Sequence, residues 1–117
     1  ISELKSWHEG LDESFQSSTL NHVYWRIRTA DFNDAANWIS EQALAGAPVR
    51  RIAAEMTDSY LSRKDYSGLS WYLDLPKEVQ NSGKLNNWYR SIDTNSPSWQ
   101  KWSAANPQLV QQLEAAE

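Results

Sequence analysis

The fold is decided by the stretch Asp31-Phe32-Asn33-Asp34-Ala35-Ala36-Asn37-Trp38. This stretch recurs loosely three more times, and each copy is recognised by its tryptophan and the residues before it. The four tryptophans, which we call the ladder, are 31, 33 and 31 residues apart and comprise Trp7, Trp38, Trp71 and Trp102. Such an interval is typical of a tandem helical repeat. The sequence therefore predicts an all-α protein in which copies of one helical hairpin stack on each other.

Apolar residues recur between the ladder tryptophans at the i, i+3, i+4, i+7 spacing of an amphipathic helix. Two segments share this spacing completely, namely Leu20, Val23, Tyr24 and Ile27, and Leu85, Trp88, Tyr89 and Ile92. We therefore expect helices that bear ladder tryptophans to alternate with helices that bear an aliphatic and aromatic stripe. Small residues three positions before the two middle tryptophans, Ala35 and Gly68, should let backbones approach closely there.

Capping and breaking residues set the expected boundaries. The first two helices should cover residues 1–12 and 19–30, the second after N-cap candidates at residues 17–19. Asp31 should cap the third helix and Gly46 should end it, and a fourth should follow over about 48–63.

Asp65 should cap the fifth helix, and Pro76 should end it. After that proline we expect two short helices or one broken helix, because Asn81-Ser82-Gly83 interrupts residues 77–84. The last two helices should begin at Pro97 and Pro107. The prediction is thus seven or eight helices in antiparallel hairpins, without a sheet, arranged as a short α-solenoid.

Length and composition fit a single domain over residues 1–117. Eleven basic and fifteen acidic residues without a run of like charge give no electrostatic reason to expect nucleic acid or an anionic membrane as partner. No apolar run is long enough to cross a bilayer, and we expect no membrane insertion. The absence of cysteine excludes disulfides and thiolate zinc sites, and it fits bacterial cytoplasm, periplasm or secretion equally well.

Because the chain begins at Ile1, we expect a piece excised or trimmed from a longer chain. Excision from an array would expose apolar faces that a neighbouring repeat had covered. Leu4 and Trp7, or Leu109 and Leu113, should then be partly exposed, and the end helices are candidates for self-association.

The repeat spacing, and the position of Trp38 and Trp71 in the first helix of each repeat, resemble the α-solenoid repeats of tetratricopeptide type. Gln42 and Leu75 stand where that pattern has glycine. The stretch from Asp31 to Trp38, and the segment from Asn87 to Trp102, are more similar to tryptophan-containing helical repeats of about 32 residues in large uncharacterised bacterial proteins. The resemblance implies a binding or scaffolding module without assigned chemistry.

The residues give little support to catalysis. His8 has no second histidine one turn away, so solvated polar side chains explain His8-Glu9 better than a metal site does. No Gly-x-Ser-x-Gly motif accompanies the serines, and the pair Asp31 and Asp34 suits the first turn of a helix. We therefore expect neither a metal nor another cofactor, and no enzymatic activity.

Seven tryptophans and five tyrosines are an unusual number, and most of them fall on ladder or stripe positions, where they should pack in a core. Trp25 is the exception, because it falls beside its stripe, one turn before Arg28. It is either a wedge between neighbouring hairpins, which we favour, or an exposed anchor for a ligand. If it is an anchor, the candidate binding residues are Trp25, Arg28, Arg51 and Arg90.

Three functions fit this sequence. The first is a module that binds a protein or peptide on the surface of the stripe-bearing helices. The second is a carbohydrate-binding or glycan-processing domain that uses exposed aromatic platforms, and the third is a structural spacer within a longer array. Exposed aromatic rings that lie coplanar in a groove would favour the sugar-binding function. Scattered polar groups around one or two anchor residues would favour the protein-binding function.

Overall fold

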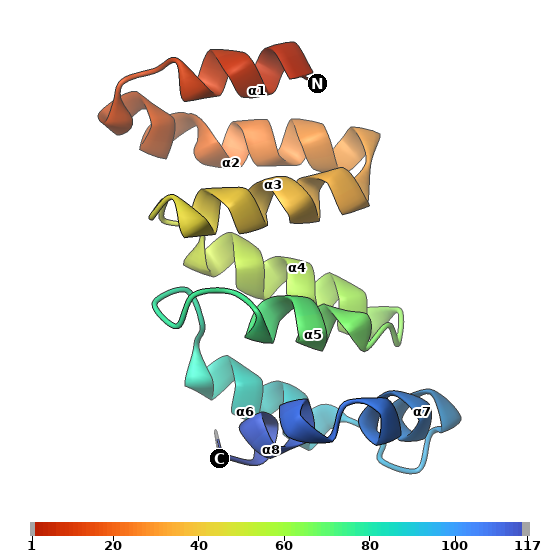
Figure 1. The fold of residues 1–117 in the computed structure, drawn as a ribbon. Coiled ribbons are helices and arrows are strands. Elements are labelled where there is room, and N and C mark those ends of the chain that lie inside the picture. Colours follow the sequence, from red (N-terminus) through yellow and green to blue (C-terminus); the bar gives the residue numbers. More distant parts are fainter. Residues whose placement is uncertain (1, 116–117) are drawn as a thin grey trace. The chain divides into compact units, whose positions relative to one another are not determined.

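The computed structural model describes the backbone of residues 2–115 and, apart from residues 2, 13, 14 and 17, their side chains. This part of the chain is all-α and contains no strand, as the sequence predicts (Figure 1). Its eight helices are α1 (Ser2–Glu9), α2 (Glu13–Ala30), α3 (Phe32–Leu44), α4 (Arg50–Ser62), α5 (Ser67–Leu73), α6 (Ser82–Ser91), α7 (Pro97–Ala105) and α8 (Pro107–Ala115).

Three helices begin after an N-cap residue with a polar side chain. The side chains of Asp31, Asn81 and Ser96 accept hydrogen bonds from the third backbone amide after them, at 3.1, 3.1 and 3.2 Å. Each of these bonds satisfies one amide that has no partner within its helix. The caps at Asp31 and Ser96 confirm the prediction, whereas Asn81 starts α6 rather than interrupting a helix. Asp65 precedes α5 by two residues and accepts from the backbone amide of Ser67 at 3.1 Å.

Two predicted boundaries are wrong. α2 begins at Glu13, six residues before the expected start at residue 19, and the hydroxyl groups of Ser18 and Thr19 donate to the Phe15 carbonyl inside the helix. Hydroxyl side chains can form such bonds to the preceding turn as well as cap a helix end. Between α5 and α6 no further helix forms, because the Gln80 side chain donates to the carbonyls of Leu73 and Leu75 and holds this segment in turns.

The chain divides into two compact units, residues 1–52 and 53–117, with the boundary inside α4. In the first unit α2 packs against both α1 and α3 (Figure 1). Trp38 is fully buried in this core, with 1% of its surface exposed. An ion pair of 2.7 Å between Lys5 and Asp34 joins α1 to α3. The largest buried residues of this core are Tyr24, Ile27, Trp38 and Ile39.

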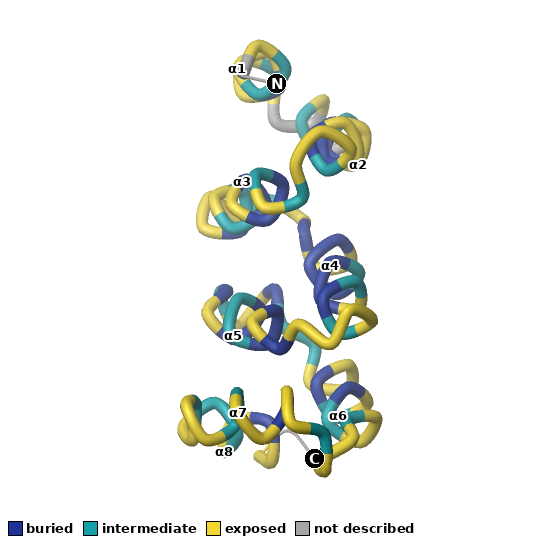
Figure 2. The backbone as a smooth tube through the Cα atoms, turned by 90° about the vertical axis from the view of Figure 1, so that its right-hand side faces the viewer, coloured by how far each residue is buried: buried dark blue, intermediate teal, exposed yellow. Residues whose placement is uncertain are grey.

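The second unit has two layers of helices. Figure 2 shows α6 next to α4, and α7 and α8 on the side of α5. The indole N–H of Trp88 in α6 donates to the Asp58 carboxylate of α4 at 2.6 Å, and the indole N–H of Trp102 in α7 donates to the Ser70 hydroxyl of α5 at 3.2 Å. Each layer is therefore held together by a tryptophan hydrogen bond.

The end helices differ in burial. In the first unit Leu4 is half-buried and Trp7 is 50% exposed, which confirms the expectation for that end of the chain. In the second unit Leu109 is half-buried, but Leu113 is completely covered because α8 packs against α6.

Candidate functional site

Trp25 lies on the exposed flank of α2. Its neighbours Val23, Tyr24 and Ile27 are completely buried, whereas 45% of the Trp25 surface is exposed. Within the first unit Trp25 therefore does not fill a gap between helices. An exposed tryptophan is a large apolar contact surface that loses water only when something else covers it.

Arg28 is fixed in place beside Trp25. Its guanidinium carbon lies 4.9 Å from the centre of the Trp25 ring and 5.2 Å from the centre of the Phe32 ring, and one guanidinium nitrogen donates to the Tyr24 hydroxyl at 2.7 Å. A cation over the face of an aromatic ring is attracted by the ring quadrupole, most strongly over tryptophan. We call Tyr24, Trp25, Arg28 and Phe32 the Trp25 patch; Arg28 and Phe32 are half-buried within it.

The segment of α2 that carries most of the Trp25 patch has only basic charges. Between residues 15 and 30 the only fully charged side chains are Arg26 and Arg28, and no acidic residue occurs. The nearest carboxylates along the chain have other contacts, because Asp31 caps α3 and Asp34 pairs with Lys5. The patch thus combines an exposed indole with a cationic group.

The four predicted site residues lie on three different helices. Trp25 and Arg28 lie together as the sequence suggested, and the interaction joins residues one helical turn apart. Arg51 is exposed in the first turn of α4, whereas Trp25 lies on α2. Arg90 is exposed in the last turn of α6, in the second unit.

His8 is buried, contrary to the expectation of a solvated side chain, with 1% of its surface exposed. Its Nδ1 lies 2.9 Å from the Thr19 hydroxyl, and its ring meets the Trp38 ring edge-on, with 5.4 Å between the centres. Burial lowers the pKa of His8, while the neighbouring Glu9 carboxylate raises that pKa by a smaller amount. In the described part of the chain no three His, Cys, Asp or Glu side chains are grouped as metal ligands would be.

Two pockets accompany these features. One of roughly 90 Å³ lies beside His8 in the first unit. The other, of roughly 280 Å³, lies between α4 and α6 in the second unit, and we call it the Asp58 pocket. It is lined by Asp58, Leu61, Ser62, Tyr66, Trp88, Ser91 and Ile92.

Sequence reasoning missed the Asp58 pocket and two rings of the Trp25 patch. Tyr24 and Phe32 stand four residues before and after Arg28, so helical spacing was a usable signal for their contact with it. Asp58 belongs to no recognisable motif in the sequence. Its contact with Trp88 joins residues 30 positions apart, which no local pattern reveals.

Comparison of the chain with family models, with curated proteins and with solved structures found no match. Within residues 2–115 no helix has both the length and the apolar character that a bilayer crossing requires.

Proposed function

We propose that this chain is a helical repeat module that binds a protein or peptide, with the Trp25 patch as its anchor, and that it acts by binding and not by catalysis. The observation that carries the proposal is the exposed indole of Trp25 held against a fixed arginine. Tryptophan and arginine are enriched among the residues that dominate binding energy at protein interfaces. A side chain that is already fixed loses less conformational entropy on binding.

A repeat arrangement of tetratricopeptide type is part of this proposal. Three side-chain contacts join residues that are separated by about one ladder interval: Lys5 and Asp34 by 29 positions, Asp58 and Trp88 by 30, and Ser70 and Trp102 by 32. Each joins a helix to the next helix of the same kind, within a single unit. Such contacts are expected where each repeat touches only its neighbours.

The burial of the aromatic residues of the second unit favours a protein partner over a sugar. A sugar-binding platform needs exposed ring faces, but Tyr66 and Trp99 are at least nine-tenths buried and pack against each other with ring centres 5.5 Å apart. Tyr72 and Trp88 likewise meet edge-on inside the second unit. These rings contribute to the core.

The proposal is tested by selecting peptides that bind the immobilised chain from a displayed random library and measuring their affinities for variants. Trp25→Ala should lower the affinity for the selected peptides by at least about tenfold, which corresponds to roughly 1.4 kcal/mol of binding free energy. Arg28→Ala should lower the affinity for these peptides as well. Trp7→Ala is the matched control, because Trp7 is an equally exposed tryptophan on another helix of the same unit.

Two outcomes would contradict the proposal. If the selected peptides bound the Trp25→Ala variant with unchanged affinity, the binding surface would have to lie elsewhere on the protein. Binding to an array of glycans that depends on Trp25, together with no selected peptide, would support the sugar-binding function instead.

A further inference from the structure

The Asp58 pocket is formed by matching faces of two helices in the second unit. α4 contributes residues 58, 61 and 62, and α6 contributes residues 88 and 91, with Ile92 directly after its end. The two sets therefore have the same i, i+3, i+4 spacing in the sequence. Tyr66, just before α5, completes the lining. The apolar part of the lining consists of Leu61, Ile92 and the two aromatic rings.

The polar groups of this pocket mostly offer hydrogen-bond acceptors. The Ser62 hydroxyl donates to the Ser59 carbonyl at 2.9 Å, and the Ser91 hydroxyl donates to the Asn87 carbonyl at 2.8 Å. With each hydroxyl proton used inside its own helix, the lone pairs of the oxygen remain for a ligand. The Tyr66 hydroxyl can donate or accept.

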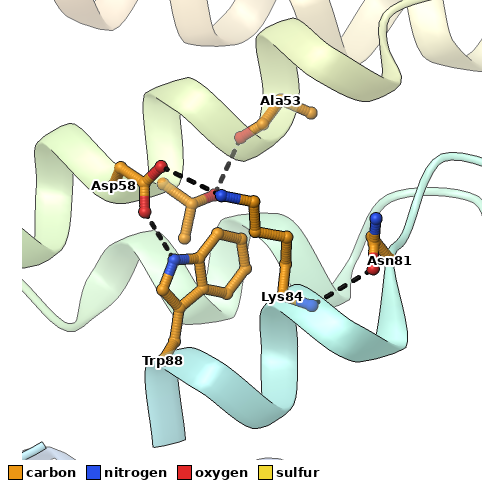
Figure 3. Close-up of polar contacts among 6 residues, drawn as sticks. Ala53, Asp58, Asn81, Lys84 and Trp88 are labelled. Carbon is orange, nitrogen blue, oxygen red and sulfur yellow. Dashed lines mark hydrogen bonds and ion pairs between the residues drawn. The ribbon is translucent and has the colours of Figure 1, made fainter. Parts of the chain in front are cut away.

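Asp58 gives the pocket its charge. One carboxylate oxygen accepts the indole N–H of Trp88 at 2.6 Å, and the other lies 3.8 Å from the ammonium nitrogen of Lys84, as Figure 3 shows. The Trp88 donor is therefore already used, whereas the Lys84 contact is longer than a hydrogen bond. Both charged side chains are about half exposed, so their ion pair contributes little and is easily displaced.

We propose that the Asp58 pocket binds an arginine side chain of a partner protein or peptide. A guanidinium group carries five N–H donors in a planar fork and one positive charge, which suits a carboxylate flanked by two serine acceptors. Its flat face stacks on aromatic rings, and its methylene groups pack against Leu61 and Ile92. In the free protein Lys84 partly neutralises Asp58, and the incoming arginine displaces it.

This second site does not depend on the Trp25 patch, which lies in the other unit. The two sites also differ in composition, because the Trp25 patch contains an exposed indole and the Asp58 pocket contains a carboxylate. Loss of one site by mutation should therefore leave the other intact.

N-acetyl-arginine amide tests the proposal, with NMR of the tryptophan indole N–H signals as the readout. The Trp88 signal should shift on titration, and the affinity should fall at least about tenfold in Asp58→Asn. N-acetyl-citrulline amide has nearly the same shape without the charge and should not bind. Asp93→Asn is the matched control, because it removes another exposed carboxylate of the second unit.

Lys84→Ala gives a result that a merely structural role for Asp58 would not produce. Removing the internal competitor should tighten the binding of N-acetyl-arginine amide, by about twofold. An unchanged or weaker affinity in Lys84→Ala would overturn the proposal. So would equal binding of citrulline, or binding that survives Asp58→Asn in a variant whose spectrum shows it to be folded.

Discussion

Gly68 of α5 lies so close to Tyr60 of α4 that a Cβ atom built on it would be 2.4 Å from the Tyr60 Cβ. The atoms that would clash belong to the rigid base of the tyrosine side chain, so they cannot rotate away. This confirms that the small residue before the third ladder tryptophan allows two helices to approach closely.

Gly68→Ala should therefore destabilise the protein by about 1–3 kcal/mol, as overpacking does elsewhere. The substitution would otherwise favour a helix by roughly 1 kcal/mol, so a loss shows that the clash dominates. Urea unfolding monitored by circular dichroism measures the difference. Gly10→Ala is the control, because its Cβ would have ordinary contacts at 3.5 Å and should change stability by less than about 0.5 kcal/mol.

The ladder tryptophans should not be equivalent. Trp38→Ala removes a completely buried ring and should cost about 3–5 kcal/mol. Trp71 is only half-buried, with its ring centre 6.2 Å from that of Tyr60, so Trp71→Ala should cost less than Trp38→Ala. Trp25→Ala should cost least of the three, since nearly half of its surface is already in water. Equal losses for all three variants in urea unfolding would contradict this order.

Acidification should destabilise the protein through His8. Burial lowers the pKa of His8 in the folded state, so below its usual value of 6.5 the unfolded chain binds a proton that the folded chain does not. The contribution to stability is complete above pH 6.5 and is lost as the pH falls from 6.5 toward the lower pKa of the folded state. His8→Gln should flatten this part of a plot of unfolding free energy against pH.

The control for His8 is His22→Gln, since His22 is exposed on α2. If His8→Gln left the pH dependence as it is in the parent protein, another group would have to account for it.

The hydrogen bond between Trp88 and Asp58 should stabilise the second unit, whereas the ion pair with Lys84 should not. Trp88→Phe keeps most of the ring but removes the N–H, and we expect a loss of about 1 kcal/mol, since the carboxylate is half exposed. Lys84→Ala should change stability by less than about 0.5 kcal/mol. A double-mutant cycle of Trp88→Phe with Asp58→Ala, which removes the acceptor, isolates the interaction. A coupling energy near zero would contradict its structural role.

Much of the helical fold follows from local patterns in the sequence. The caps at Asp31 and Ser96 and the prolines that open α7 and α8 lie where propensity places them, and no distant contact is needed to predict them. The start of α2 was misplaced because Ser18 and Thr19 suit a cap and a helix interior alike. Only the contact of Thr19 with His8 in another helix distinguishes these alternatives, and that contact depends on packing.

The candidate sites, too, were predictable from the sequence only where their residues are close together in the chain. Trp25 and Arg28 are one turn apart on one helix, so their contact was predictable, while the exposure of Trp25 depends on where α3 packs. His8 appeared solvated because its partner Trp38 lies 30 residues along the chain. The Asp58 pocket requires two helices to present matching faces, and no single segment of the sequence encodes it.

The spans of 29, 30 and 32 residues between Lys5 and Asp34, Asp58 and Trp88, and Ser70 and Trp102 also bear on how the chain folds. Loop-closure entropy grows only with the logarithm of loop length, so the three closures differ by less than about 0.1 kcal/mol. None of the three therefore has an entropic reason to form last. Contacts that span about one repeat are typical of helical repeat proteins, and helical proteins fold in roughly microseconds to milliseconds.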